Sequence, residues 1–321
     1  MDLLTLRQIA GAIQASAVFR GKTGIRTAAS FFAGGAAAGA IRNGDDAAAI
    51  PDGDGYLLLA AEGIIPELIR RDPYLAGRSA VLANVNDIYA MGGRPVALVD
   101  VVGARDEVTL ELCRGLRDGA ARYRVPIVGG HVVQAVTDVS LSVAVLGRAR
   151  SLVTSFDATP GDRLVLVTND DGCWLGDHGY WNATLKRNEP SLLEHLELIP
   201  LAAEAGLVRS GKDVSMSGIS GTVLMLAEAS GVGARLDLGS VAPPPGVPLV
   251  PWLLAFMSYG FVLAVRPEAV DAFVAPFRNR GLRATEIGSI TAGSSVTLEL
   301  DGDETLLWDW RVKPFTGMAV A

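Results

Sequence analysis

Two segments of almost continuous apolar character, residues 96–102 and 139–146, limit most strongly how this chain can fold. Each has the length of a β-strand, and neither shows the strict apolar-polar alternation of a strand with one solvated face. Strands of this kind are typical of sheets that are covered on both faces. We therefore predict a strand in each segment, and we expect residues 95–102 to be buried on both faces.

Helical and strand patterns alternate along the rest of the chain. Apolar residues recur at helical spacing in five segments, which we predict as helices: residues 3–13, 77–91, 109–122, 191–205 and 217–230. Short apolar runs predict further strands at residues 56–62, 127–128, 164–167, 259–265 and 295–300. Residues 20–42 are rich in glycine and alanine and are predicted to form a mobile arm. The alternation predicts an α/β or α+β fold.

The chain length of 321 residues suggests two domains. Residues 149–161 are the candidate linker, because Pro160 and Gly161 signal a turn directly before a new strand. We therefore predict an amino-terminal domain at residues 1–150 and a carboxy-terminal domain at residues 160–321. Half of all residues are hydrophobic, which is ample for a sizeable core in each domain.

Composition excludes several classes of function. The net charge of −7, with no compensating basic cluster, argues against nucleic acid as a partner. The start of the chain lacks the pattern of a signal peptide, and the apolar stretch 249–265 is interrupted by Pro251 and Gly260, so we expect no membrane association. Cys113 and Cys173 define neither a disulfide framework nor a zinc site. A reducing, cytoplasmic location is the simplest interpretation.

The first candidate site is the stretch Asn43, Gly44, Asp45 and Asp46, in which two adjacent carboxylates follow a glycine. Hard cations such as Mg²⁺ bind carboxylate oxygens together with the phosphates of a substrate. The stretch therefore predicts Mg²⁺ that is held for a nucleotide. Asn-Gly and Asp are also ordinary turn residues, so a polar turn is the alternative.

Three further acidic residues stand in apolar or glycine-rich surroundings. Glu62 ends a predicted buried strand, Asp87 lies in a predicted helix, and Asp213 comes shortly before another helix. Charged residues are rarely placed among apolar neighbours unless they are paired or hold a metal. Helix capping by Asp87 or by Asp213 is the alternative.

These motifs, in this order over residues 40–240, resemble those of the aminoimidazole ribonucleotide synthetase superfamily. Its members include thiamine-monophosphate kinase, selenide water dikinase and the hydrogenase maturation carbamoyl dehydratase. Residues 44–48 resemble the Gly-Asp-Asp-Ala-Ala of the kinase, and residues 84–92 resemble its Asn-x-Ser-Asp-Leu-x-Ala-Met-Gly, with Asn86 in place of serine. Residues 129–131 resemble the Gly-Gly-His of the selenide enzyme, and residues 212–228 the Asp-Val-Ser/Thr-x-Gly start of a helix.

The resemblance implies a two-domain fold whose amino-terminal domains pair into a shared β-barrel, and hence a homodimer. It implies ATP and Mg²⁺ as cofactors. The implied metal ligands are Asp45, Asp46, Glu62, Asp87 and Asp213. Glu62 replaces an aspartate of the kinase but can still reach a metal. Asp213 would close over the nucleotide and also activate an acceptor.

The remaining candidate residues are expected to contact the nucleotide or to take part in the reaction. The residues expected to bind the nucleotide are Asn43, Gly44, Lys22, Asn84, Gly129 and Gly130. His131 stands where other members have an acidic residue, and it could orient a phosphate, act as an acid or base, or be a loop residue. For Lys22 the alternative is a solvated lysine, and for Gly129 and Gly130 it is a tight turn.

Two features depart from the kinase. Met216 stands where that enzyme has a second aspartate, and residues 170–181 have no counterpart, so they either line a substrate pocket or form a surface insertion.

The acidic motifs and the resemblance together predict an ATP-dependent enzyme that phosphorylates or activates a small polar acceptor. A nucleotide-binding regulator without turnover and a structural partner in a complex are the alternatives.

Overall fold

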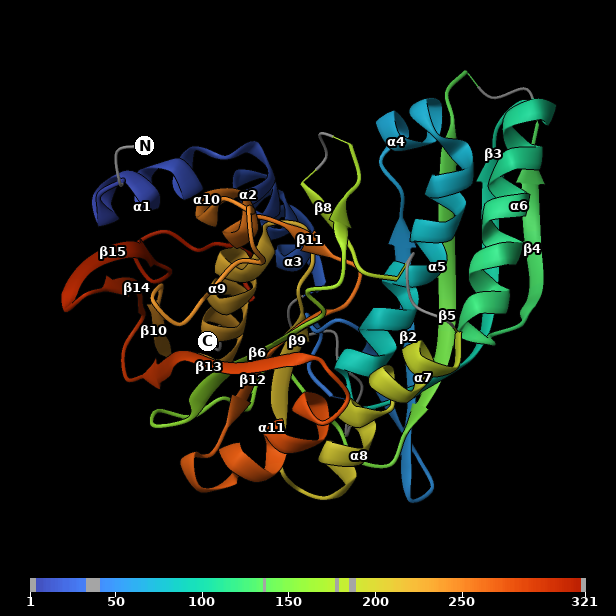
Figure 1. Cartoon of the computed structure of the whole chain (residues 1–321). Helices are drawn as coiled ribbons and strands as arrows, with labels where there is room; N and C mark the ends of the chain where they lie inside the picture. The colour runs from blue at the N-terminus through green and yellow to red at the C-terminus, as the bar shows by residue number, and fades with distance from the viewer. Residues whose placement is uncertain (1–3, 33–40, 135–136, 177–178, 185–188, 319–321) are drawn as a thin grey trace.

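The structure is a computed structural model that describes residues 4–32, 41–134, 137–176, 179–184 and 189–318. The chain folds into two mixed α/β units that lie side by side (Figure 1). The amino-terminal unit contains a five-stranded sheet with the order β1-β2-β5-β3-β4. The carboxy-terminal unit contains a seven-stranded sheet with the order β15-β14-β10-β13-β6-β12-β9, and β11, β8 and β7 form a small third sheet.

The amino-terminal sheet is covered by helices on one face. Its strands are β1 (Ala48–Asp52), β2 (Gly55–Gly63), β3 (Arg94–Gly103), β4 (Ile127–Val133) and β5 (Ser140–Ala149). All neighbouring strands are antiparallel except β3 and β4, which are parallel. The helices of this unit are α4 (Pro66–Arg71), α5 (Pro73–Ala90) and α6 (Asp106–Tyr123), and α5 and α6 cover the sheet (Figure 1).

The other face of this sheet carries exposed apolar side chains. Leu98 and Val102 of β3 are buried under the helices, whereas the alternating Val99 and Val101 are 43% and 46% exposed. Exposed apolar side chains extend across the neighbouring strands of this bare face: Ile50, Leu59 and Leu146. The prediction of a strand at residues 95–102 is confirmed, but its expected burial on both faces is wrong within one chain, because only one face of β3 meets the helices.

The carboxy-terminal unit has helices on both faces of its sheet. Its strands are β6 (Arg163–Thr168), β9 (Ser210–Asp213), β10 (Gly233–Asp237), β12 (Gly260–Val265), β13 (Arg283–Thr291), β14 (Ser295–Leu300) and β15 (Asp303–Asp309). The small sheet consists of β7 (Cys173–Trp174), β8 (Tyr180–Asn182) and β11 (Phe256–Met257). The helical elements are α7 (Glu189–Leu196), α8 (Leu198–Glu204), α9 (Gly218–Ser230), α10 (Leu249–Leu253), η2 (Pro267–Ala269) and α11 (Val270–Arg278).

Alternate residues of β6 face two different cores. Val165 and Val167 belong to the same buried cluster as Leu58 and Val85 of the amino-terminal unit, whereas Leu166 belongs to a second cluster around α9. One hydrophobic core is therefore continuous between the two units. This shared packing holds their relative positions.

The arm that was expected to be mobile is helical where the structure describes it. The chain forms α1 (Leu6–Ala15), α2 (Ala17–Gly21), η1 (Lys22–Gly24) and α3 (Ile25–Phe32). Ile13 and Phe19 are fully buried, and the Gln14 side-chain amide donates a 2.6 Å hydrogen bond to the carbonyl of Leu307. These buried side chains dock the segment directly before the predicted arm on the carboxy-terminal unit, and residues 20–32 of the arm itself are helical, with Lys22 bonded to Ser215 of that unit. The described part of the arm therefore has regular structure, and its mobility stays a prediction. Residues 33–40 lie outside the described residues.

Other sequence predictions are confirmed or corrected in detail. The predicted helix at 191–205 is two helices, α7 and α8, because Pro200 has no N–H to bond the carbonyl four residues earlier. The candidate linker is ordered: Val153 is buried, and its N–H donates to the carbonyl of Met91 at 3.1 Å. The apolar stretch 249–265 forms α10, β11 and β12, as expected for a core segment. Among the described helices, none has the length and apolar character needed to cross a membrane.

A buried carboxylate fixes the carboxy-terminal segment. Glu228 of α9 is completely buried and accepts hydrogen bonds from the backbone N–H groups of Phe315, Thr316 and Gly317 at 2.8, 2.7 and 3.2 Å. The Thr316 hydroxyl donates to it as well, at 2.6 Å. These donors replace the water that the carboxylate loses on burial. They also place Thr316 and Met318 at the edge of the cavity described below.

Candidate active site

A cavity of about 960 Å³ lies where the amino-terminal unit, the helical arm and the carboxy-terminal unit meet. The amino-terminal unit contributes the loop before β1, the end of β2 and one face of α5. The carboxy-terminal unit contributes the end of β9, the loop after it and the small three-stranded sheet. All five of the predicted acidic residues line this cavity, and so do Lys22, Asn43 and Gly44.

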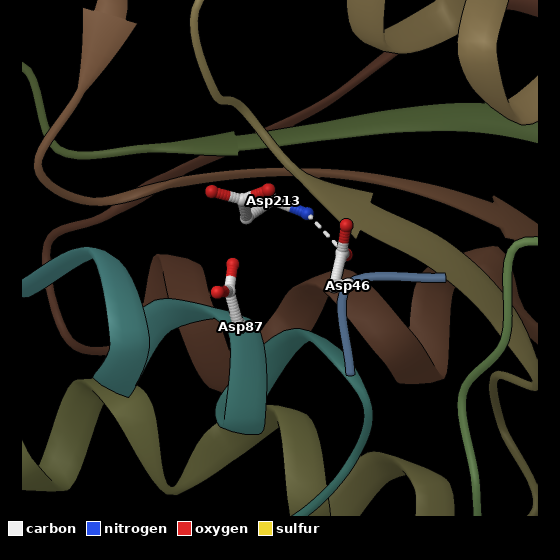
Figure 2. Close-up of side chains that lie close together, drawn as sticks. All are labelled: Asp46, Asp87 and Asp213. Carbon is white, nitrogen blue, oxygen red and sulfur yellow. Dashed lines mark hydrogen bonds between the residues drawn. The ribbon is translucent and has the colours of Figure 1, made fainter. Parts of the chain in front are cut away.

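Three carboxylates from separate elements converge at the cavity. Asp46 precedes β1, Asp87 lies near the end of α5, and Asp213 ends β9. Each offers an oxygen atom that lies within 4.8 Å of the other two, and the three side chains point toward one another (Figure 2). The N–H of Asp213 also donates to Asp46 Oδ2 at 3.3 Å (Figure 2). We call these residues the acidic cluster.

Burial and mutual repulsion raise the pKa of two members of the acidic cluster, Asp87 and Asp213. Burial, reinforced by the charge of Asp46, raises the pKa of Asp213 to about 8. Burial, reinforced by Asp213, raises the pKa of Asp87 well above its ordinary range. Asp87 Oδ2 is buried and has no hydrogen-bond partner among the described residues. Three carboxylates with an unused buried oxygen are a donor set that suits a hard cation such as Mg²⁺.

Lys212, which the sequence analysis missed, is the cation already present beside the cluster. Its ammonium forms a buried ion pair with Asp46 and lies 3.3 Å from Ser155 Oγ. Burial alone would lower the pKa of Lys212, but the carboxylates of Asp46 and Asp45 outweigh burial and raise it. In the sequence, Lys212 directly precedes Asp213, and the other two residues of this short strand, Ser210 and Gly211, are uncharged.

Asp45 is turned toward Ser155 rather than toward the acidic cluster. It accepts hydrogen bonds from the N–H and the hydroxyl of Ser155 at 2.8 and 2.5 Å. Burial raises the pKa of Asp45 to about 6, against the opposing charge of Lys212. Asp45 thus joins the loop before β1 to the segment between the two units. Its assignment as a metal ligand stays a prediction.

Glu62 and Lys22 face the same cavity from opposite parts of the chain. Glu62 is the penultimate residue of β2, and burial raises its pKa above the ordinary value, although the charge of Lys22 opposes the rise. The Lys22 ammonium donates to the hydroxyl of Ser215 at 3.2 Å. The alternative of a solvated lysine is therefore wrong, because Lys22 is half-buried in the cavity wall.

Gly44 occupies a backbone position that requires glycine. Its φ of 113° is unfavourable for other residues, and a Cβ atom there would lie 2.7 Å from the Met318 sulfur. Asn84 is fully buried in α5, where its amide donates to the carbonyl of Ala80 at 2.8 Å, and it does not line the cavity. Its expected contact with the nucleotide has no support in this geometry.

Gly129, Gly130 and His131 lie outside the cavity in the described chain. All three belong to the edge strand β4, so the expectation of a loop or tight turn is wrong. A Cβ atom on Gly130 would lie 2.8 Å from the Asp100 carboxylate, so this glycine makes room for a neighbouring side chain. His131 pairs with Val101 in the parallel ladder and therefore lies on the bare face of the sheet.

The capping alternatives for Asp87 and Asp213 are wrong. Asp87 lies inside α5, and α9 begins at Gly218, five residues after Asp213. Met216, which replaces an expected aspartate, is 43% exposed and lines the cavity. Of the two alternatives for residues 170–181, pocket lining is the one that the structure supports, since Trp174 and Tyr180 face the cavity.

The chain matches two models of one protein family. Residues 44–149 match the AIR synthase related protein N-terminal domain, and residues 159–301 match the AIR synthase related protein C-terminal domain. "Uncharacterized protein sll0787" of Synechocystis sp. is 49% identical over 280 residues, which is 87% of each chain.

Solved structures of low sequence identity share the fold. "T. maritima PurL complexed with ATP" has a TM-score of 0.70 at 17% identity, over 84% of this chain and 46% of that chain. "AaThiL complexed with AMPPCP and TMP" has a TM-score of 0.61 at 19% identity, over 81% of this chain and 88% of that chain. Because the two family models together match most of the sequence, the chain belongs to the AIR synthase related family.

Proposed function

We propose that the protein is an ATP- and Mg²⁺-dependent enzyme that phosphorylates or activates a small acceptor molecule. The observation that carries this proposal is the acidic cluster, in which Asp46, Asp87 and Asp213 bring oxygen atoms within 4.8 Å of one another in a cavity of about 960 Å³. A cavity of this volume has the size of a small-molecule site. Carboxylates crowded in this way need a cation between them before a phosphate can approach.

Mg²⁺ at the acidic cluster would neutralise the phosphate oxygens of ATP and the charge that develops during phosphoryl transfer. Asp45 and Glu62 remain further candidate ligands, since both line the same cavity. Lys22 and Lys212 supply two positive charges for phosphate oxygens. Gly44, which lacks a side chain, lets a phosphate approach the backbone of the loop.

The fold comparisons support a nucleotide as the ligand. "T. maritima PurL complexed with ATP" and "AaThiL complexed with AMPPCP and TMP" share this fold and are both nucleotide complexes. The alternative of a nucleotide-binding regulator without turnover is favoured by Met216, which places a thioether in the cavity where a second carboxylate was expected. Turnover distinguishes the two proposals, because both require the nucleotide to bind.

We further propose that a second copy of the chain covers the bare face of the amino-terminal sheet. Val99, Val101, Leu59 and Leu146 would otherwise leave a continuous apolar surface in water, and such surfaces mark interaction sites. A shared barrel covers both sheets at once. His131 lies on this face and would then be buried between the two copies.

The cluster predicts that Mg²⁺ stabilises the protein more strongly at higher pH. Because the pKa of Asp213 is raised to about 8, the folded protein binds more protons than the unfolded chain between about pH 4 and pH 8, and its stability falls as pH rises through this range. Mg²⁺ requires the ionised carboxylates. We expect the Mg²⁺-induced rise in Tm to be larger at about pH 8.5 than at about pH 6. Equal rises at both pH values, or the same dependence in Asp213→Asn, would contradict the assignment.

Replacing Asp46 and Asp213 should have different effects on binding and turnover. Asp46→Asn should abolish ATP binding. Asp213→Asn should leave ATP binding largely intact, because Asp46, Asp87 and the phosphates would still hold the cation, and it should lower kcat by about 10²-fold, as expected for an interaction made in the transition state. Asp46→Asn also removes the negative charge that pairs with the buried Lys212 ammonium, and breaking such a pair typically lowers the free energy of unfolding by about 3–5 kcal/mol.

The double variant Asp46→Asn with Lys212→Met is the control, since it removes both charges together. ATP affinity by calorimetry, ADP release and Tm are measured on each variant. Full turnover in Asp213→Asn would show that this residue has no catalytic role.

The bare face predicts the oligomeric state. Sedimentation at micromolar concentration should give about twice the chain mass of 33.5 kDa. Leu59→Lys, on the bare face, should give a monomer because the charge would be buried without a partner. Leu306→Lys, at an equally exposed position of β15, should stay dimeric. A monomeric wild-type protein would rule out the shared barrel.

A further inference from the structure

The cavity carries an aromatic surface that the proposed nucleotide and metal chemistry does not use. Trp174 of β7, Tyr180 of β8 and Phe256 of β11 all line the cavity and all belong to the small three-stranded sheet. We call these three side chains the aromatic wall. Two of them come from the segment 170–181, for which the family motifs offered no counterpart.

The aromatic wall is rigid because further rings support it. Trp174 packs edge-on against Trp181 with ring centroids 5.5 Å apart, and Trp181 packs in the same way against the fully buried Trp252 at 5.4 Å. Tyr180 packs edge-on against Phe256 at 4.9 Å. Rings fixed in this way lose little freedom when a ligand binds against them.

A backbone hydrogen bond joins the strand that carries part of the aromatic wall to the segment that carries Asp213. The N–H of Met257 in β11 donates to the carbonyl of Val214 at 3.2 Å, and Val214 directly follows Asp213. From the opposite side, Ser79 and Ala83 line the cavity on the same face of α5 as Asp87, at intervals of four residues. These two small side chains leave room beside the cluster for a ligand body.

The distribution of charged and apolar groups around the cavity indicates the chemical character of the ligand that would occupy this space. Lys22 and Lys212 are the cationic side chains among the described lining residues. Lys22 bonds to Ser215, and Lys212 is paired with Asp46, so both positive charges lie on the side of the cavity where the carboxylates are. The remaining lining next to α4 and the small sheet is apolar, with Ile65 and Leu68 as examples. A ligand against these surfaces gains free energy from apolar and ring contacts.

We propose that the acceptor has a flat, largely apolar aromatic or heteroaromatic ring that lies against the aromatic wall, with its nucleophilic oxygen or nitrogen directed at the acidic cluster. This inference rests on the proposed function, because it names the class of acceptor for the same site. It makes the expectation of a small polar acceptor more specific, since the polar nucleophile would be carried by a ring.

Benzyl alcohol serves as the probe, and glycerol serves as a polar alcohol without a ring. Binding is measured by saturation-transfer NMR on the full chain with Mg²⁺ and AMPPCP present. Benzyl alcohol should bind and glycerol should not. Trp174→Ala should weaken benzyl alcohol binding by about tenfold, the size expected for losing one buried aromatic contact.

Two further variants keep the result interpretable. Trp174→Leu retains an apolar side chain of the wall if the alanine variant does not fold, and it should also weaken the probe. Tyr56→Ala removes a half-buried aromatic residue that does not line the cavity, and it should leave probe binding unchanged. Unchanged binding in both Trp174 variants, or binding of glycerol as strong as that of benzyl alcohol, would overturn the proposal.

ATP affinity, measured separately, distinguishes this inference from the proposed function. If the Trp174 variants lose ATP affinity and keep the probe, the wall holds the adenine ring and the acceptor inference is wrong. If the wild-type protein binds the probe at the wall but does not bind ATP, the proposed function fails while the ring-binding surface stands.

Discussion

The electrostatic repulsion among Asp46, Asp87 and Asp213 is the constraint on which the site depends. The three carboxylates come from a loop, a helix and a strand that are far apart in the sequence, and folding brings them together away from water. Such an arrangement is stable only when protons or cations compensate the charge. Lys212 compensates Asp46, and burial together with the neighbouring carboxylates raises the pKa of Asp87 and of Asp213, so that these two groups favour their protonated forms.

Contacts between the two units hold this crowded site together. The shared hydrophobic core fixes the units relative to each other, and the hydrogen bonds from Ser155 to Asp45 attach the loop before β1 to the segment between them. Lys22 bonds to Ser215, and Glu228 holds the carboxy-terminal segment against the same loop. The free energy for bringing like charges together therefore comes from packing and hydrogen bonds outside the cluster.

Local patterns in the sequence were sufficient for much of the fold. The helix at 77–91 and the strands at 56–62 and 259–265 were predicted from their own apolar residues, and the structure confirms them as α5, β2 and β12. Asp46, Asp87 and Asp213 were also identifiable, since an acidic residue in apolar surroundings is unusual. Their convergence followed only from the family resemblance, because contacts between distant segments leave no local pattern.

The features that sequence reasoning missed depend on such distant contacts. The apolar pattern of β3 indicates that both faces of the strand favour burial, but it does not indicate whether the same chain or another chain covers the second face. Lys212 and Ser155 are common residue types whose importance comes from what faces them across the cavity. The helices at residues 20–32 were missed because the glycine and alanine content of residues 20–42 suggested mobility, and the contact with Ser215 through Lys22 joins distant parts of the chain.

A calorimetric titration of the protein with ATP tests the central claim most directly. The claim is that a divalent cation must separate the acidic cluster from the phosphates. The titration is performed first in EDTA and then in excess Mg²⁺. The account predicts binding in Mg²⁺ and no measurable binding in EDTA, because ATP and the carboxylates repel each other without the cation. Equal affinity under both conditions would contradict it.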